Sequence, residues 1–244
     1  MIPYKIHYCW FGGGDIPQRE RRCIESWKKL MPEFELVLWD EKRFDVNAVG
    51  FTKEAYKMKK YAFVSDYVRL YALINEGGIY LDTDVEVVKS LADFTKYKAF
   101  GSFETPHVVQ TGVIGSIPNG ALVSKMFEYY QNKSFVLDGG ILNQVPNSKI
   151  LTDILLEEGL VLNNLKQSLP SYEIFPTDYF CPIDQATREI IVTENTYCIH
   201  YLSGSWLSAK DRFTRGVKAF IGNRLGWGVV NAIRNLLVND KKGL

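Results

Sequence analysis

The chain has 244 residues, and 46% of them are hydrophobic, so it can bury a substantial core as one large domain or two small ones. The 29 basic and 28 acidic residues give a formal net charge of +1, which argues against a surface coated by nucleic acid. We therefore expect a folded protein with no nucleic-acid partner.

The first ten residues carry one lysine and lack the apolar core of a signal peptide, so the sequence predicts a protein that is not exported. No stretch has the roughly eighteen consecutive apolar residues that a membrane span needs. The cysteines show neither CxxC nor metal-finger spacing, and we expect reduced, packed thiols at Cys9, Cys23, Cys181 and Cys198. These features together predict a cytoplasmic location.

The hydrophobic pattern predicts strands and helices in alternation. In chain order, the predicted elements are a strand at 5–11 that runs into three glycines, a helix at about 17–30, a strand at 34–40, a helical stretch at about 52–75 in one or two pieces, a strand at 79–87, strands at 98–104 and 108–116, and helices near 122–131 and 149–158. Such alternation indicates the α/β class, with a mostly parallel sheet covered by helices. Ligands of these sheets bind beyond the carboxyl ends of the strands.

Acidic residues occupy alternate positions in one predicted strand, GGIYLDTDVEV at 77–87. Side chains two apart on a strand point the same way, so Asp82 and Asp84 lie on one side if the strand persists that far. Two adjacent carboxylates repel each other without a cation, whereas Mg²⁺ or Mn²⁺ accepts carboxylate oxygens together with water and substrate phosphates. The alternative is a charged strand edge that opposes aggregation.

The predicted helix upstream carries Ser65, Asp66 and Arg69 within about one turn. Asp66 and Arg69 are three residues apart and are therefore neighbours on one helical face. The surrounding residues are nearly all apolar, so the helix should be largely buried, and buried charges need a partner. This arrangement favours a sugar or phosphate contact over a surface ion pair of small stabilising effect.

Three separated runs carry a resemblance to a known family: KIHYCWFGG, AFVSDYVRLYALINEGGIYLDTDVEV and CIHYLSGSW. They resemble the glycosyltransferases of family thirty-two, which contain a DXD sugar-binding motif and include capsular-polysaccharide enzymes and yeast initiation mannosyltransferases. The same runs resemble the catalytic domains of the clostridial glucosylating toxins. The resemblance implies the GT-A fold, in which a Rossmann-like half binds a nucleotide-sugar donor together with Mn²⁺ or Mg²⁺.

The resemblance also implies a role for each matching residue. Trp10 matches the aromatic residue that stacks on the base, and the contacts to the donor's sugar and ribose match Ser65, Asp66 and Arg69. Tyr80 matches one more donor contact. Asp82 matches the first carboxylate of the motif, which reaches ribose, sugar or metal-bound water, and Asp84 matches the direct metal ligand. The loop that closes over metal and diphosphate matches His200, Ser203, Ser205 and Trp206, with His200 as a further candidate metal ligand. Asp82, Asp84 and Arg69 are thus the candidate catalytic residues.

Family members of this type retain the anomeric configuration of the donor sugar, and we assign no catalytic base because the leaving phosphate can accept the acceptor's proton. Arg69 could reinforce the neutralisation of the diphosphate. Glu104 is a candidate contact to acceptor or donor or else a solvated charge at a strand end. By analogy with the fold, donor-sugar contacts often occur where this chain has Gln110, Thr111 and Gly112. The segment from Asp138, DGGILNQVPN, has a composition suited to a lid.

Some of these residues have a structural alternative. Trp10 could fill the core, and His200 could be a hydrogen-bonded interior histidine. His7 and His107 have no comparable sequence context, so neither is predicted as a ligand.

The C-terminal segment is the basic part of the chain. From Trp206 onward it holds eight lysines or arginines and two aspartates, a net charge of about +6, with apolar residues at helical spacing. We expect a transferase domain over 1–208 and a basic amphipathic helical extension over 209–244. Such a helix can lie on an anionic membrane, and its alternatives are packing on its own domain or a dimer contact.

The sequence therefore predicts a bacterial-type, metal-dependent, retaining glycosyltransferase of the cytoplasmic membrane face. Its donor is expected to be a UDP-sugar, with GDP still open, and its acceptor a glycan or lipid-linked saccharide in capsular or other surface polysaccharide synthesis. One rival is a non-catalytic nucleotide-sugar-binding protein. Another is an Asp-dependent phosphohydrolase, which carries its Asp-x-Asp on the first strand, whereas here the motif is not on the first strand.

Overall fold

The computed structural model describes residues 1–184 and 187–204. The predictions for Ser205, Trp206, the domain boundary at 208 and the helical extension at 209–244 lie outside the described residues.

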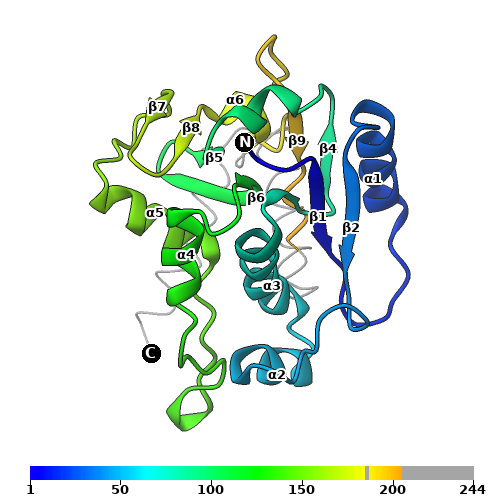
Figure 1. Ribbon diagram of the computed structural model, residues 1–244, viewed down its shortest axis with the longest axis vertical. Coiled ribbons are helices and arrows are strands. Elements are labelled where there is room, and N and C mark those ends of the chain that lie inside the picture. The colour runs from blue at the N-terminus through cyan, green and yellow to red at the C-terminus, as the bar shows by residue number, and fades with distance from the viewer. Residues whose placement is uncertain (185–186, 205–244) are drawn as a thin grey trace, which may run out of the picture.

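A seven-stranded sheet forms the centre of the molecule, in the order β2-β1-β3-β6-β5-β8-β7 (Figure 1). Five strands run in one direction, and only β6 and β7 run against them. The strands are β1 (Lys5–Cys9), β2 (Glu35–Trp39), β3 (Gly78–Leu81), β5 (Ala99–Thr105), β6 (Val108–Ser116), β7 (Gln167–Ser168) and β8 (Glu173–Phe175). This arrangement confirms the predicted α/β class with a mostly parallel sheet.

A second, two-stranded sheet joins segments that are far apart in the sequence. β4 (Val85–Val87) pairs antiparallel with β9 (Cys198–His200), so that Val85 lies opposite His200. The prediction of one continuous strand at 79–87 is therefore wrong. The chain leaves the main sheet after Leu81, turns at 82–84, and enters the second sheet.

Helices cover both faces of the main sheet. They are α1 (Gln18–Leu30), α2 (Gly50–Lys57), α3 (Tyr61–Glu76), α4 (Ala121–Glu128), α5 (Asn147–Glu157) and α6 (Thr177–Phe180), with short 3-10 helices η1 (Ala92–Lys96) and η2 (Asp138–Gly140). The predicted helical stretch at 52–75 is two helices, separated where Lys59 adopts a positive φ of 57°. Helix α3 ends at Gly77, whose φ of 62° turns the chain into β3, a conformation that favours glycine.

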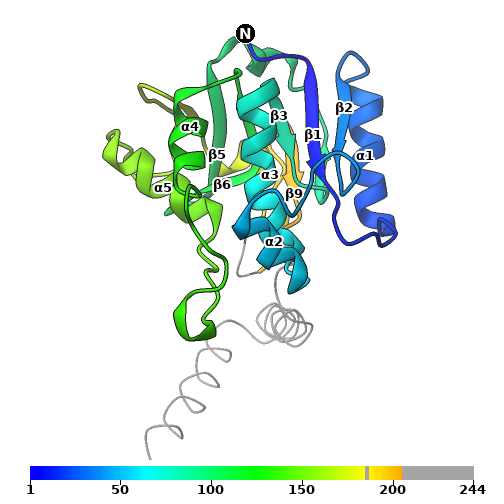
Figure 2. The ribbon, with the colours of Figure 1, turned by 60° about the horizontal axis from the view of Figure 1, so that its bottom comes forward.

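Two hydrophobic cores lie on opposite faces of the sheet. Residues of α2 to α5 pack on one face and residues of α1, η1 and α6 on the other. Figure 2 shows α3 and α4 lying over the first of these faces. In β3, Tyr80 belongs to the first core and Ile79 and Leu81 to the second, so this strand is buried on both sides. All four cysteines are buried and unpaired, as predicted. Within the described part of the chain, no helix is both long and apolar enough to cross a membrane.

Candidate active site

The candidate site lies where β3 ends. Because β1 and β3 are parallel, Trp10 and Asp82 follow their strands at the same edge of the sheet. The Asp82 N–H donates to the carbonyl of Gly112 in β6 at 2.8 Å, and the Val85 N–H donates to the Asp82 carbonyl at 3.0 Å. These two bonds form the turn that brings Asp82 and Asp84 together, in place of the strand alternation that the sequence predicts.

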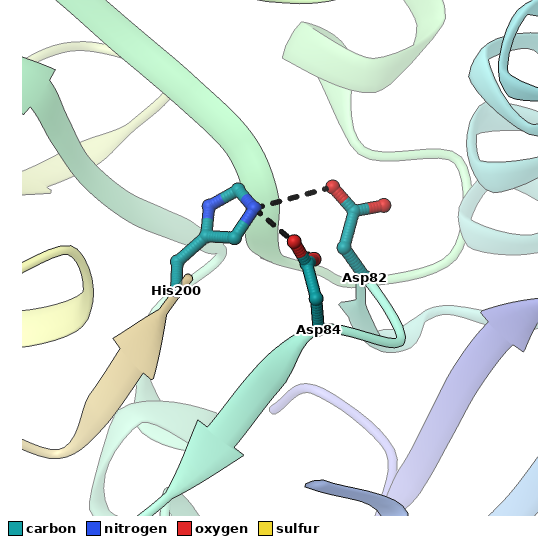
Figure 3. Close-up of side chains that lie close together, drawn as sticks. All are labelled: Asp82, Asp84 and His200. Atoms are coloured by element: carbon teal, nitrogen blue, oxygen red, sulfur yellow. Dashed lines mark ion pairs between the residues drawn. The ribbon is translucent and has the colours of Figure 1, made fainter. Parts of the chain in front are cut away.

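Asp82, Asp84 and His200 converge from this turn and from β9 (Figure 3). The Nε2 atom of His200 lies 3.4 Å from Asp84 Oδ1 and 3.8 Å from Asp82 Oδ2. One ligand atom from each of the three residues lies within 4.8 Å of the others. The pairing of β4 with β9 fixes this geometry, since Tyr201 N–H also donates to the Asp84 carbonyl at 3.1 Å.

The electrostatics of the cluster couple Asp84 to His200. Burial acts to raise the pKa of Asp84, but the His200 ring and the Ser203 N–H, which donates to Oδ2 at 2.7 Å, hold that pKa well below its usual range. Burial likewise acts to lower the pKa of His200, but the Asp84 carboxylate outweighs it and raises the pKa well above its usual value. Without a metal, His200 therefore carries a proton as the partner of Asp84.

Arg69 holds the other side of Asp82. Its Nη2 atom lies 3.0 Å from Asp66 Oδ1 and 3.2 Å from Asp82 Oδ1, and its Nη1 donates to the Thr111 carbonyl at 2.7 Å. The Tyr80 ring lies 4.5 Å from the guanidinium carbon, and its hydroxyl donates to Asp82 Oδ1 at 3.2 Å. The side chains of Arg69 and Asp66 are only 6% and 14% exposed, which excludes the alternative of a surface ion pair.

Burial raises the pKa of Asp66 to about 6, with Arg69 opposing the shift and Asp82 adding to it. Because one guanidinium faces two carboxylates here, the pocket keeps an excess of negative charge near neutral pH.

Trp10 and Ser65 lie beside this network. The thiol of Cys9, the last residue of β1, contacts both Ser65 and Tyr80, and Trp10 follows it in the chain. Trp10 is half-buried, and its Nε1 donates to the Gly14 carbonyl at 2.6 Å, which ties the ring to the glycine loop. The structure thus gathers most of the predicted residues at one edge of the sheet, and their individual roles stay predictions.

The first residues of β6 complete the wall of the site in a way that the sequence does not reveal. The Gln110 side chain is fully buried, and its Oε1 lies 3.0 Å from Nδ1 of His200. A Cβ atom on Gly112 would lie 2.4 Å from Cε1 of His200 and 3.0 Å from Oδ2 of Asp82, so a glycine is needed there for close approach. The alternation of side chains along β6 is the only signal that could have placed Gln110 and Gly112 on one face.

Two further acidic residues, Glu86 and the candidate Glu104, lie outside the cluster. Glu86 accepts a hydrogen bond from the Tyr201 hydroxyl, which accounts for the third carboxylate of the alternating run. Glu104 is half-buried and lines a hollow of about 440 Å³ together with Thr177, Asp178 and Cys181. A contact between Glu104 and the acceptor or donor stays a prediction.

The residues present fit a divalent cation. Two carboxylates and one imidazole are a donor set that suits Mn²⁺ or Mg²⁺ bound together with phosphate oxygens. The Ser203 hydroxyl is buried beside Asp84, next to the N–H that binds its carboxylate, so a further polar group lies at the cluster.

Comparisons with known proteins agree with this chemistry. The sequence model of the family described as "Glycosyltransferase sugar-binding region containing DXD motif" matches residues 17–101. An uncharacterized glycosyltransferase of Acanthamoeba polyphaga mimivirus is 32% identical over 173 residues, and the match covers 64% of this chain and 66% of that protein. A mannosyl phosphorylinositol ceramide synthase of Saccharomyces cerevisiae is 26% identical over 151 residues, with 56% of this chain and 38% of that protein covered.

The chain thus spans less than two thirds of the length of either relative. Among solved structures, the PaToxG glycosyltransferase has a TM-score of 0.49 at 17% identity, with 64% of this chain and 70% of that chain covered. The family model takes in α3, β3 and the Asp82–Asp84 turn, and so covers the run AFVSDYVRLYALINEGGIYLDTDVEV but neither of the other two runs. Over residues 17–101 the chain thus matches the family of glycosyltransferases whose sugar-binding region contains a DXD motif.

Proposed function

We propose that this protein transfers a hexose from a nucleotide-diphosphate sugar to a saccharide acceptor, with retention of the anomeric configuration. The observation that carries the proposal is the convergence of Asp82, Asp84 and His200 beside the buried Arg69. A divalent cation bound there would neutralise the charge that develops on the departing nucleoside diphosphate. The donor we propose is a UDP-sugar, and the cation Mn²⁺ or Mg²⁺.

Asp82, Asp84 and Arg69 have different roles in binding the donor. The Asp82 side chain is 28% exposed and that of Asp84 13%, which supports Asp82 as the carboxylate that reaches the donor and Asp84 as the metal ligand. Arg69 is fixed by Asp66 and by the Thr111 carbonyl, so its charge is positioned before the donor arrives. A preorganised cation of this kind stabilises developing negative charge without reorganisation during the reaction.

Donor binding can be tested by thermal unfolding of the wild type and of Asp84→Ala with UDP- and GDP-sugars, each with and without Mn²⁺. Free ligand at about one hundred times its dissociation constant stabilises the fold by roughly 2.7 kcal/mol, which gives a clear shift in Tm. We expect one nucleotide sugar to stabilise the wild type only when Mn²⁺ is present, and to leave Asp84→Ala unchanged. No stabilisation by any donor would contradict the proposal.

Turnover of a radiolabelled donor separates an enzyme from a non-catalytic nucleotide-sugar-binding protein. NMR of the product's anomeric proton then tests retention. An inverted anomer would overturn the retaining mechanism while leaving the transferase activity in place.

The acceptor we propose is a glycan or lipid-linked saccharide, assembled at the cytoplasmic face of a membrane during surface polysaccharide synthesis. Support comes from the basic, amphipathic composition of the C-terminal segment and from the name of the yeast relative, a mannosyl phosphorylinositol ceramide synthase. Removal of the chain from Phe213 onward should weaken binding to anionic liposomes. Unchanged binding would remove the membrane part of the proposal.

A further inference from the structure

A chain of three buried hydrogen bonds leads away from His200. Its Nδ1 lies 3.0 Å from Oε1 of Gln110, and Nε2 of Gln110 donates to the Ser102 hydroxyl at 2.7 Å. The Ser102 hydroxyl in turn donates to the Phe103 carbonyl at 3.0 Å. Gln110 and Ser102 are both fully buried, so water does not compete for these bonds.

The Phe103 carbonyl, which ends this series of hydrogen bonds, favours one donor-to-acceptor direction for all three of them. A backbone carbonyl can only accept, so the Ser102 proton points toward Phe103 and the Ser102 oxygen is free to accept from the Gln110 amide. The Gln110 oxygen then faces His200 and must accept a proton from Nδ1. With the amide turned by 180°, the single Ser102 proton could not serve both Gln110 and the Phe103 carbonyl, and one bond would be lost.

This direction matters because a histidine can bind a metal only through a nitrogen that carries no proton. When Nδ1 holds the proton, the lone pair of a neutral ring lies on Nε2. That atom is the one that faces Asp82 and Asp84, at 3.8 and 3.4 Å. The opposite tautomer would direct an N–H into the place that a cation needs.

We propose that Gln110 is a positioning residue that holds His200 in the ring orientation and tautomer required of a metal ligand, with Ser102 fixing the direction of the Gln110 amide. The inference rests on the proposed metal-dependent function. It also assigns Gln110 away from the donor sugar, because both polar atoms of its amide are used within the protein and its side chain has no exposed surface.

Gly112 supports the same arrangement. It lies two residues beyond Gln110 in β6, on the same face, and its missing side chain leaves room for the His200 ring. One strand therefore supplies both the space for His200 and the hydrogen bond that orients it.

Calorimetric titration of the full chain with Mn²⁺ tests the assignment. Loss of an outer partner of a metal-binding histidine typically lowers metal affinity about 10- to 100-fold, and we expect this from Gln110→Leu. Gln110→Glu keeps an acceptor opposite Nδ1 and should rescue the affinity. Ser102→Ala only frees the amide to turn and should have a smaller effect, and Gln131→Leu, at an exposed glutamine, is the matched control.

The tautomer of His200 can be measured directly, and it would not change if the role of Gln110 were only structural. The chain has three histidines, so the ring nitrogens of His200 can be assigned in ¹⁵N spectra by comparison with His200→Gln. In the Mg²⁺-loaded wild type we expect a proton on Nδ1 and none on Nε2, and we expect Gln110→Leu to lose that preference.

Two results would overturn the inference: wild-type Mn²⁺ affinity in Gln110→Leu, whether or not its donor binding is weaker, or a proton on Nε2 of the loaded wild type. A wild type that binds no Mn²⁺ would instead remove the metal dependence of the proposed function, and this inference with it. The two failures are therefore distinguishable.

Discussion

The protein buries two histidines in two different regions. His7 lies in β1, in the parallel half of the main sheet, where the Trp39 indole N–H donates to its Nδ1 at 3.0 Å and its Nε2 donates to the Gly77 carbonyl at 2.7 Å. His200 lies in β9, where Nδ1 meets Gln110 and Nε2 faces two carboxylates. Exposure does not separate them, since the residues are 0% and 6% exposed.

The difference lies in the partner of Nε2. Burial lowers the pKa of His7, and the neutral ring fills its place with both nitrogens paired. His200 is buried as well, yet the Asp84 carboxylate raises its pKa. His200, with its acidic partners, can therefore exchange a proton for a metal. His7, paired with a carbonyl and an indole, supports the fold.

Replacement of His200, whose ring faces the two carboxylates, should have the largest effect on turnover. A bound metal supplies several kcal/mol of transition-state stabilisation, and about 4 kcal/mol corresponds to about a thousandfold in rate. We expect His200→Ala to lower turnover by that order and to lose Mn²⁺ affinity, as measured by steady-state kinetics and calorimetry. His107→Ala, at an exposed histidine, is the control. Near-normal turnover of His200→Ala at saturating Mn²⁺ would remove His200 from the metal site.

Replacement of His7 should have the opposite result: lower stability with unchanged metal affinity. His7→Leu leaves the Trp39 N–H and the Gly77 carbonyl buried without partners, and each such group costs about 1–3 kcal/mol. We expect a loss of about 3 kcal/mol in the free energy of unfolding, roughly a 150-fold change in the folding equilibrium, from urea titration. The folded fraction should bind Mn²⁺ with wild-type affinity. A specific loss of metal affinity would mean that His7 also belongs to the site.

The sequence predicts long elements better than short ones. The strand at 108–116 has the predicted bounds, and the helices at 18–30 and 147–157 lie within a few residues of prediction, because each is long enough to show its hydrophobic period. Strands β7, β8 and β9 and helix α6 have only two to four residues, too few to form a pattern. The sequence therefore does not reveal that β9 pairs with β4 and carries His200 to the aspartates.

The candidate site was predictable in composition but not in construction. The motif and its resemblance pick out Asp82, Asp84, Arg69 and His200, whereas strand alternation is the wrong reason for the closeness of the two aspartates. The turn depends on the bond from Asp82 to the Gly112 carbonyl, and that partner lies on another strand. The buried chain from Gln110 to Ser102 likewise depends on the pairing of β5 with β6.

A substitution at Gly112 should displace the His200 ring without altering the imidazole itself, and its effect should be smaller. In Gly112→Ala, the new methyl group would meet ring atoms at 2.4 and 2.7 Å, far inside contact distance. The backbone is held at this point, because the Gly112 carbonyl accepts from the Asp82 N–H and the Thr111 carbonyl accepts from Arg69. We expect Mn²⁺ affinity to fall about 10- to 100-fold, the range found when the support of a metal ligand is lost. Gly50→Ala, at a glycine with open space around it, is the matched control. Equal affinities in the two variants would show that His200 can move and still bind.

The two histidines should also give the metal-free protein opposite dependences on pH. The folded pKa of His200 is raised, so its contribution to stability is fully present below the unfolded pKa of about 6.5 and is lost as pH rises toward the folded pKa. The folded pKa of His7 is lowered. Stability is therefore lost as pH falls below about 6.5, because His7 then binds a proton in the unfolded chain but not in the folded one. Each effect has a slope of at most about 1.4 kcal/mol per pH unit.

Urea unfolding in EDTA between pH 5.5 and 8 would show both slopes. We expect His200→Gln to flatten the alkaline side alone, because the other buried histidine, His7, titrates in the opposite sense. Saturating Mn²⁺ should remove the same slope from the wild type, since the metal replaces the proton on His200. An alkaline slope that survives both changes would belong to another group, and the proton of His200 would then not be the one that a metal displaces.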